Sequence, residues 1–135
     1  MSFRFTVSIR ARHVNADSSE LAQDLLLKTK TAWAKGDSPT TRSGFKRIPR
    51  EEFYWCSESF SGPGEEFARC LNELVVKLEG SSALDHFLDT GGKVEVFVGL
   101  FLLGPSAGLV LDWGTMHRLA VRRVSVSFDI FGNDT

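Results

Sequence analysis

Cysteine is scarce in this sequence, and its scarcity limits both redox chemistry and metal binding. The chain has two cysteines, Cys56 and Cys70, and neither belongs to a C-x-x-C pair. Neither a disulfide framework nor a cysteine-based zinc motif is therefore indicated. The first residues read directly as a strand, with no apolar leader before them, so we expect a cytoplasmic protein with both thiols free.

Histidine is almost as rare, and no catalytic motif surrounds it. His13, His86 and His117 lie far apart in the sequence, and the one local cluster, Asp85–Asp89, lacks the spacing of metal ligands. The sequence contains no Gly-x-Ser-x-Gly elbow and no P-loop ending. We therefore predict no metal and no cofactor, and favour a non-enzymatic protein. A triad assembled from distant residues stays open.

An excess of one charge and a long apolar run are also missing. The net charge is −1, which points neither to nucleic acid nor to an anionic membrane surface. Residues 96–111 carry no charge, but Gly104–Gly108 interrupts them and they fall short of the ~20 residues that a spanning helix needs. Two strands joined by a turn explain this stretch better, and no membrane association is expected.

The residues that are present suit one globular domain over 1–135. Hydrophobic residues make up 42% of the chain, and eleven Phe and three Trp supply bulky core material. Residues 3–12 alternate between apolar and polar side chains, as a half-buried strand does. Elsewhere, helical spacing and Gly, Pro and Ser punctuation predict strands at 29–35, 53–58, 93–103, 109–113 and 124–130, and helices at 17–28, 65–80, 82–90 and 115–121.

This order, β-α-β-β-α-α-β-β-α-β, is not a strict βαβ repeat. We therefore predict an α+β fold: a single-domain antiparallel or mixed sheet of about six strands, with helices packed mainly on one face.

Charge is distributed unevenly along the chain. From Lys28 to Arg50 there are seven Lys or Arg and one Asp, a net of +6. From Glu51 to Asp89 there are nine Asp or Glu and two Lys or Arg, a net of −7. Such blocks either form partner surfaces or neutralise each other within the fold.

The basic segment contains the candidate binding residues. Its cations could line an anionic site, and aromatic side chains lie near them in the sequence. The same features occur in single-strand nucleic-acid binders, but the net charge and the core-like alternation of Phe53 and Trp55 disfavour that interpretation. A solvated basic loop is the simpler alternative. The candidate residues are Trp33, Lys35, Arg42, Lys46, Arg47, Arg50 and Tyr54.

Four stretches in order along the chain carry a family resemblance. They are Asp17–Leu21 after the first strand, Ala32–Asp37 with its Trp-x-Lys-Gly-Asp pattern, the Tyr54-Trp55 pair, and the final Phe128–Phe131. On these residues the chain resembles the mainly bacterial domain-of-unknown-function family numbered 4279. That resemblance implies no established activity, so it transfers no functional residue.

Three functional hypotheses follow from the sequence. The first is a non-enzymatic binding or protein-interaction module, by analogy with small immunity proteins, with an unknown protein as partner. The alternative is a pocket protein or small enzyme acting on an anionic metabolite, in which Trp33, Lys35, Arg42 and Tyr54 converge. The third is a homodimer that pairs through an edge strand at 109–113, near Trp113.

Overall fold

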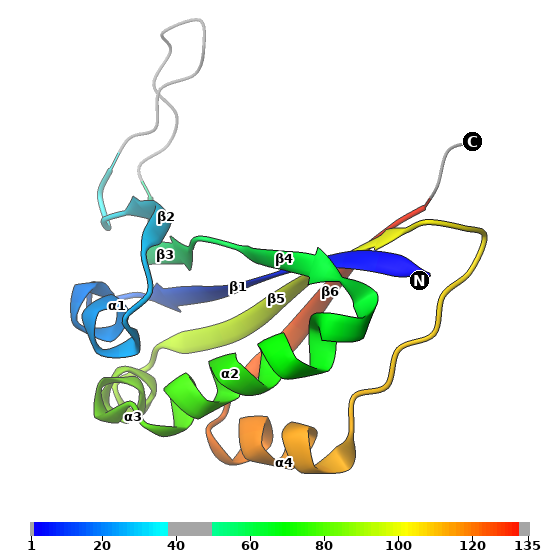
Figure 1. The fold of residues 1–135 in the computed structure, drawn as a ribbon. Coiled ribbons are helices and arrows are strands. Elements are labelled where there is room, and N and C mark those ends of the chain that lie inside the picture. Colours follow the sequence, from blue (N-terminus) through cyan, green and yellow to red (C-terminus); the bar gives the residue numbers. More distant parts are fainter. Residues whose placement is uncertain (1, 38–49, 133–135) are drawn as a thin grey trace, which may run out of the picture.

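The computed structural model describes residues 2–37 and 50–132, which form one mixed β-sheet with four helices on one of its faces (Figure 1). This arrangement confirms the predicted α+β fold. The strands are β1 (Phe3–His13), β2 (Thr29–Trp33), β3 (Phe53–Ser57), β4 (Phe60–Pro63), β5 (Lys93–Leu102) and β6 (Ser125–Phe131). The helices are α1 (Ser19–Leu25), α2 (Phe67–Glu79), α3 (Ser82–Asp89) and α4 (Trp113–Val121), with a 3₁₀ turn at Gly64–Glu66 before α2.

The first strand lies at the centre of the sheet, whose strand order is β2-β3-β1-β5-β6. On one side β1 pairs antiparallel with β5, from Phe3 to Arg12. On the other side it pairs with β3 near its end and with β4 near its start. Only the pairing of β5 with β6 is parallel among the described strands. α4 connects these two strands, because parallel neighbours need a crossover connection.

The two faces of the sheet differ in side chains and in cover. Phe3, Phe5, Val7, Ile9 and Ala11 of β1 are all buried and belong to the same hydrophobic cluster as the inner faces of the helices. The Phe5 ring, for example, meets the Phe67 ring of α2 edge-on at 5.4 Å. The alternate residues of β1 point away from the helices. We call this second side the open face, because Figure 1 shows the helices gathered on the other side.

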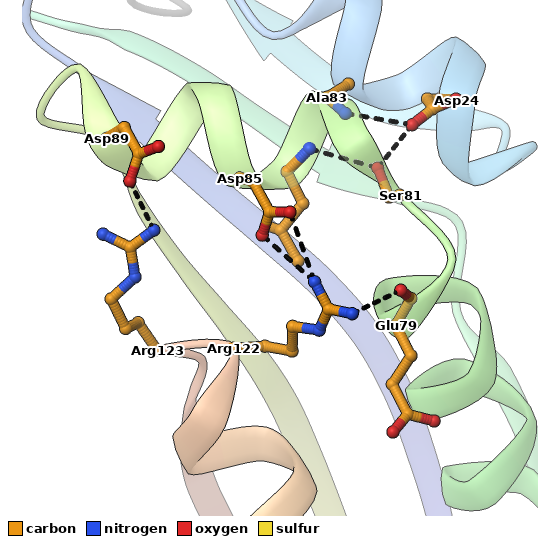
Figure 2. A network of polar contacts seen from close by, with 9 residues as sticks. Asp24, Glu79, Ser81, Ala83, Asp85, Asp89, Arg122 and Arg123 are labelled. Atoms are coloured by element: carbon orange, nitrogen blue, oxygen red, sulfur yellow. Dashed lines mark hydrogen bonds and ion pairs between the residues drawn. The ribbon is translucent and has the colours of Figure 1, made fainter.

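Ion pairs hold the helix layer together at one end (Figure 2). Arg122, just after α4, binds the Asp85 carboxylate of α3 at 3.2 Å and donates to the Glu79 carbonyl oxygen at the end of α2. Arg123 pairs with Asp89 at 2.7 Å. The acidic block predicted from the sequence therefore pairs here with C-terminal arginines, not with the described part of the basic block.

The predicted hairpin at 96–111 is wrong. Residues 109–113 form no strand: the chain from 103 to 112 is irregular, and Trp113 begins α4. Both neighbours of β5 are already taken, by β1 and by β6, so no position in the sheet was left for a returning strand. Leu109 and Leu111 instead pack against the core from this connection. The homodimer predicted from the sequence cannot pair through an edge strand at 109–113, because these residues form no strand.

The short strand β4 was not predicted. Gly62 and Pro63 predict that the preceding strand ends here, yet this segment pairs with Arg4–Val7 of β1. Proline is tolerated here because it lies at the end of a strand on the outer side of β1.

Several element boundaries also differ from prediction; the last helix, for example, begins at Trp113 rather than at residue 115. The first helix ends at Leu25 rather than near Lys28, because Leu26 takes a left-handed conformation, with φ of 57°. The strand at 29–35 ends at Trp33.

No helix in residues 2–37 or 50–132 combines the length and the apolar character that crossing a membrane requires.

Candidate functional site

An aromatic pair lies at the β2–β3 end of the sheet. Trp33, the last residue of β2, pairs in register with Tyr54 of β3. Their rings stack with centroids 4.2 Å apart and planes inclined by 21°. Both side chains are half-buried, so each also presents ring surface to solvent. Such amphipathic aromatic surface is typical of binding sites.

Arg50 adds a cation to this pair. Its guanidinium carbon lies 3.9 Å from the centroid of the Trp33 ring, a cation–π contact. Backbone hydrogen bonds fix the residue: Gly36 donates to the Arg50 carbonyl at 2.8 Å, and the Arg50 amide donates to the Asp37 carbonyl at 2.7 Å. Gly36 can close this turn because its φ of 93° suits glycine.

Register places two further cations beside the aromatic pair. Tyr54 lies opposite Arg12 of β1, and Arg12 lies opposite Lys93 of β5. Residues that face each other across antiparallel strands point to the same side of the sheet. Trp33, Tyr54, Arg12 and Lys93 therefore follow one another across four strands of the open face. We call these four residues and Arg50 the basic–aromatic row.

The next row of the open face is centred on Arg10. Its guanidinium carbon lies 3.6 Å from the centroid of the Phe97 ring, and its Nη1 lies 4.0 Å from a Glu95 oxygen. Ser127 of β6 donates to Glu95 at 2.6 Å, which holds this carboxylate in place. The Nε atoms of Arg10 and Arg50 are buried, and neither has a hydrogen-bond partner among the described residues.

A small cavity of about 170 Å³ lies between these rows. Cations dominate its lining, with one carboxylate among them, so the local field favours an anion. The lining residues are Arg10, Arg12, Lys93, Val94, Glu95 and Ser125.

The Tyr54 phenol is neutral at physiological pH. Burial raises its pKa above the ordinary value, and the neighbouring Cys56 raises it further, while Arg10 and Arg12 act in the opposite direction. A neutral phenol is both a donor and an acceptor of hydrogen bonds. Tyr54 is therefore suited to contact a partner through hydrogen bonds.

A larger cavity, of about 380 Å³, reaches the same aromatic pair from α1. Trp33 and Tyr54 contribute to its lining, together with Asp17 and Asp37. Two carboxylates repel an anion, so this cavity does not suit the anionic metabolite considered from the sequence. Lys35 does not line this cavity.

The candidate residues from the sequence are only partly brought together. Trp33, Arg50 and Tyr54 meet, and Lys35 lies exposed in the turn that follows β2. The remaining three, Arg42, Lys46 and Arg47, lie outside the described residues.

Sequence analysis missed the cations on the neighbouring strands. Arg10 and Arg12 were recognised only as the polar side of a strand, and Lys93 as the start of another. The available signal was the repeated arginine on that polar side. Whether these arginines join a binding site depends on which strands lie next to β1. The alternation of polar and apolar residues does not identify those neighbouring strands.

His13, which is buried, has a structural role. Its Nδ1 accepts hydrogen bonds from the backbone amides of Asn15 (2.9 Å) and Ala16 (3.0 Å), and its Nε2 lies 2.9 Å from the Thr90 hydroxyl. With Nδ1 accepting, Nε2 is the protonated nitrogen of the neutral ring. No group of three or more His, Cys, Asp or Glu within the described ranges has the arrangement to hold a metal ion.

Comparisons of the chain with protein-family models, with curated proteins and with solved structures found no match.

Proposed function

We propose that this protein is a non-enzymatic binding module that holds an acidic segment of a partner protein against the open face of its sheet. The single observation that carries this proposal is the basic–aromatic row, which crosses four strands on the face that no described helix covers.

The chemistry of the row supports an acidic partner. Arg12, Lys93 and Arg50 supply positive charge, and Arg10 adds a fourth cation beside a single carboxylate, Glu95. Arginine binds carboxylates through two parallel hydrogen bonds, and its planar group also stacks on aromatic rings. Trp33 and Tyr54 add rigid contact area at a low cost in conformational entropy.

A protein partner fits this face better than a nucleic acid does. Bases need free ring faces on which to stack. Here the Trp33 ring already contacts Tyr54 and Arg50, and the Phe97 ring is covered by Arg10. Asp129 on β6 adds a further negative charge to the open face. This carboxylate would repel the phosphates of a nucleic acid bound there.

Neutralising the two central cations of the row tests this proposal. For Arg12→Gln with Lys93→Gln, we expect the partner's affinity to fall by at least about tenfold, because charge-assisted hydrogen bonds are lost. The protein is purified from the cells that make it, and native mass spectrometry measures the fraction with a stoichiometric partner. Arg69→Gln is the matched control, because Arg69 lies exposed on α2 in the helix layer.

Partner occupancy that is unchanged in the double variant would refute the open-face proposal. Equal losses in the double variant and in Arg69→Gln would show a general charge effect and would refute it too. High salt should also weaken binding, because exposed charges are screened.

The alternative function, a pocket protein or small enzyme for an anionic metabolite, is favoured by the cavity that Arg10, Arg12 and Lys93 line. At about 170 Å³ it suits one phosphate or carboxylate group rather than a large ligand. Inorganic phosphate should then raise the Tm of the wild type and not that of the double variant. An equal response of both proteins would remove this alternative.

A further inference from the structure

The two edges of the sheet differ in how well they are protected from pairing. The β2 edge is short, contains Lys30 and has an irregular register between Thr29 and Thr31. Lysine and bulges of this kind discourage pairing with another strand. The β6 edge has seven residues, no proline or lysine, and a regular register along β5.

Large apolar side chains are exposed along β6. Phe128 and Ile130 point to the helix side, and their exposed fractions are 38% and 64%. Phe131 points to the open side, is 47% exposed and stacks on Phe101 at 4.8 Å. The strand order ends at β6, so its outer edge pairs with no described strand. Exposed apolar side chains beside an unpaired edge are typical of a strand-pairing site.

The sequence of β6 is complementary to itself when two copies run antiparallel and are centred on Phe128. Phe128 then faces its own copy, and Val126 faces Ile130, so the apolar residues of the helix side meet one another. On the open side, Asp129 faces Ser127, which is uncharged, and no like charges are opposed. A register centred on Asp129 would instead place two carboxylates opposite each other, which is unfavourable.

We propose that two copies of this chain form a symmetric dimer through antiparallel pairing of their β6 strands, centred on Phe128. The occupant of this edge is a second copy because the strand complements itself in both polarity and charge. The two sheets then become one continuous sheet, and both helix layers lie on the same side. This dimer does not depend on the proposed binding function of the open face.

Sedimentation equilibrium across a concentration series tests the dimer. The chain has a mass of 15.0 kDa, so the wild type should approach twice that mass as concentration rises. Ile130→Lys places a cation in each half of the interface, and it should raise the dimer dissociation constant by at least about tenfold. Val76→Lys is the matched control, because Val76 is a 54% exposed valine on the remote helix α2.

Cysteine cross-linking tests the register without relying on the lysine variant. Phe128→Cys should form a covalent dimer on oxidation, because directly opposed residues lie within reach of a disulfide. Ile130→Cys should not, since its copies would lie about four residues apart along the strands, or ~13 Å. The unsubstituted chain, with Cys56 and Cys70, controls for cross-links through the native thiols.

A dimer that Ile130→Lys weakens and Val76→Lys leaves intact supports the proposal, as does a cross-link specific to Phe128→Cys. A monomer at the highest attainable concentration overturns it and leaves the edge to a strand of a different protein. A dimer that survives Ile130→Lys overturns it as well, because another surface must then form the contact. A cross-link through Ile130→Cys in place of Phe128→Cys overturns the register and with it the proposal.

Discussion

At the scale of single residues, one carboxylate of α1 forms hydrogen bonds that link this helix to the start of α3. Asp24 accepts hydrogen bonds from the Ser81 hydroxyl at 2.6 Å and from the Ala83 amide at 3.2 Å (Figure 2). Ser81 in turn caps α3, because its hydroxyl oxygen accepts from the Leu84 amide at 3.1 Å. The hydrogen bond from Ser81 and then that from Ala83 lower the pKa of Asp24.

This pKa shift predicts a pH dependence of stability. A lowered pKa in the folded state means that ionised Asp24 stabilises the fold above its unfolded pKa, and this contribution is lost as the pH falls below about 5. Asp24→Asn should therefore lower Tm at pH 7 and flatten the decline of Tm between about pH 5 and pH 3. Thermal unfolding followed by circular dichroism measures both effects.

The control for Asp24→Asn is Glu51→Gln, which neutralises an exposed carboxylate elsewhere in the chain. It should leave the acid decline of Tm nearly as steep as in the wild type. If both variants flattened the decline equally, Asp24 would have no special part in acid stability.

At the scale of elements, a break in the sheet divides β3 from β4. Arg10 of β1 pairs with Cys56 of β3, and Val7 of β1 pairs with Phe60 of β4. The segment between β3 and β4 therefore contains one residue more than the facing segment of β1. The Ile9 amide, which faces this break, donates instead to the Ser57 hydroxyl oxygen at 2.9 Å. A side chain thus replaces the missing backbone acceptor at a buried position.

Ser57→Ala should destabilise the protein by about 1–3 kcal/mol, because the buried Ile9 amide loses its acceptor. Chemical denaturation gives the free energy of unfolding. Ser61→Ala, at an exposed position of β4, is the matched control and should change it little. A neutral Ser57→Ala variant would mean that water or a backbone shift satisfies the amide.

Elements with a clear period were predictable from sequence, and those defined by pairing were not. The alternation in β1 and the helical spacing of Phe67, Leu71, Leu74 and Leu78 identify their elements because burial acts on one face of each. β4 and the supposed strand at 109–113 were misjudged, since a strand exists only where a neighbour offers free hydrogen-bonding groups.

Only those residues of the candidate site that lie near one another in the sequence could be predicted. Trp33, Arg50 and Tyr54 were grouped as candidates because the basic segment and the aromatic residues adjoin in sequence, and the structure places these three close together. Arg12 and Lys93 join them only through the neighbouring positions of β1 and β5.

At the scale of the whole molecule, stability is concentrated at the centre of the sheet. β1 pairs with three strands, whereas β2 pairs only with β3 among the described strands. Val7 and Ile9 of β1 and Val96 and Val98 of β5 have no exposed surface. Opening this region therefore requires disruption of the entire core.

Amide hydrogen exchange should reflect this arrangement. Amides of β1 that bond to β5 should exchange only through global unfolding, and those of β2 faster, through local opening. Exchange followed by mass spectrometry at low protein concentration measures both without a contribution from dimerisation. Exchange of β1 amides before those of β2 would contradict the view that the first strand anchors the fold.

The central position of β1 also has a consequence for synthesis in the cell. The ribosome releases Phe5, Val7 and Ile9 well before the strands that pair with β1, which lie at 53–63 and 93–102. At about 5–20 residues per second, the apolar side of the first strand waits roughly 5–20 seconds for β5. We therefore expect chaperones that shield exposed apolar segments to bind the nascent chain during translation.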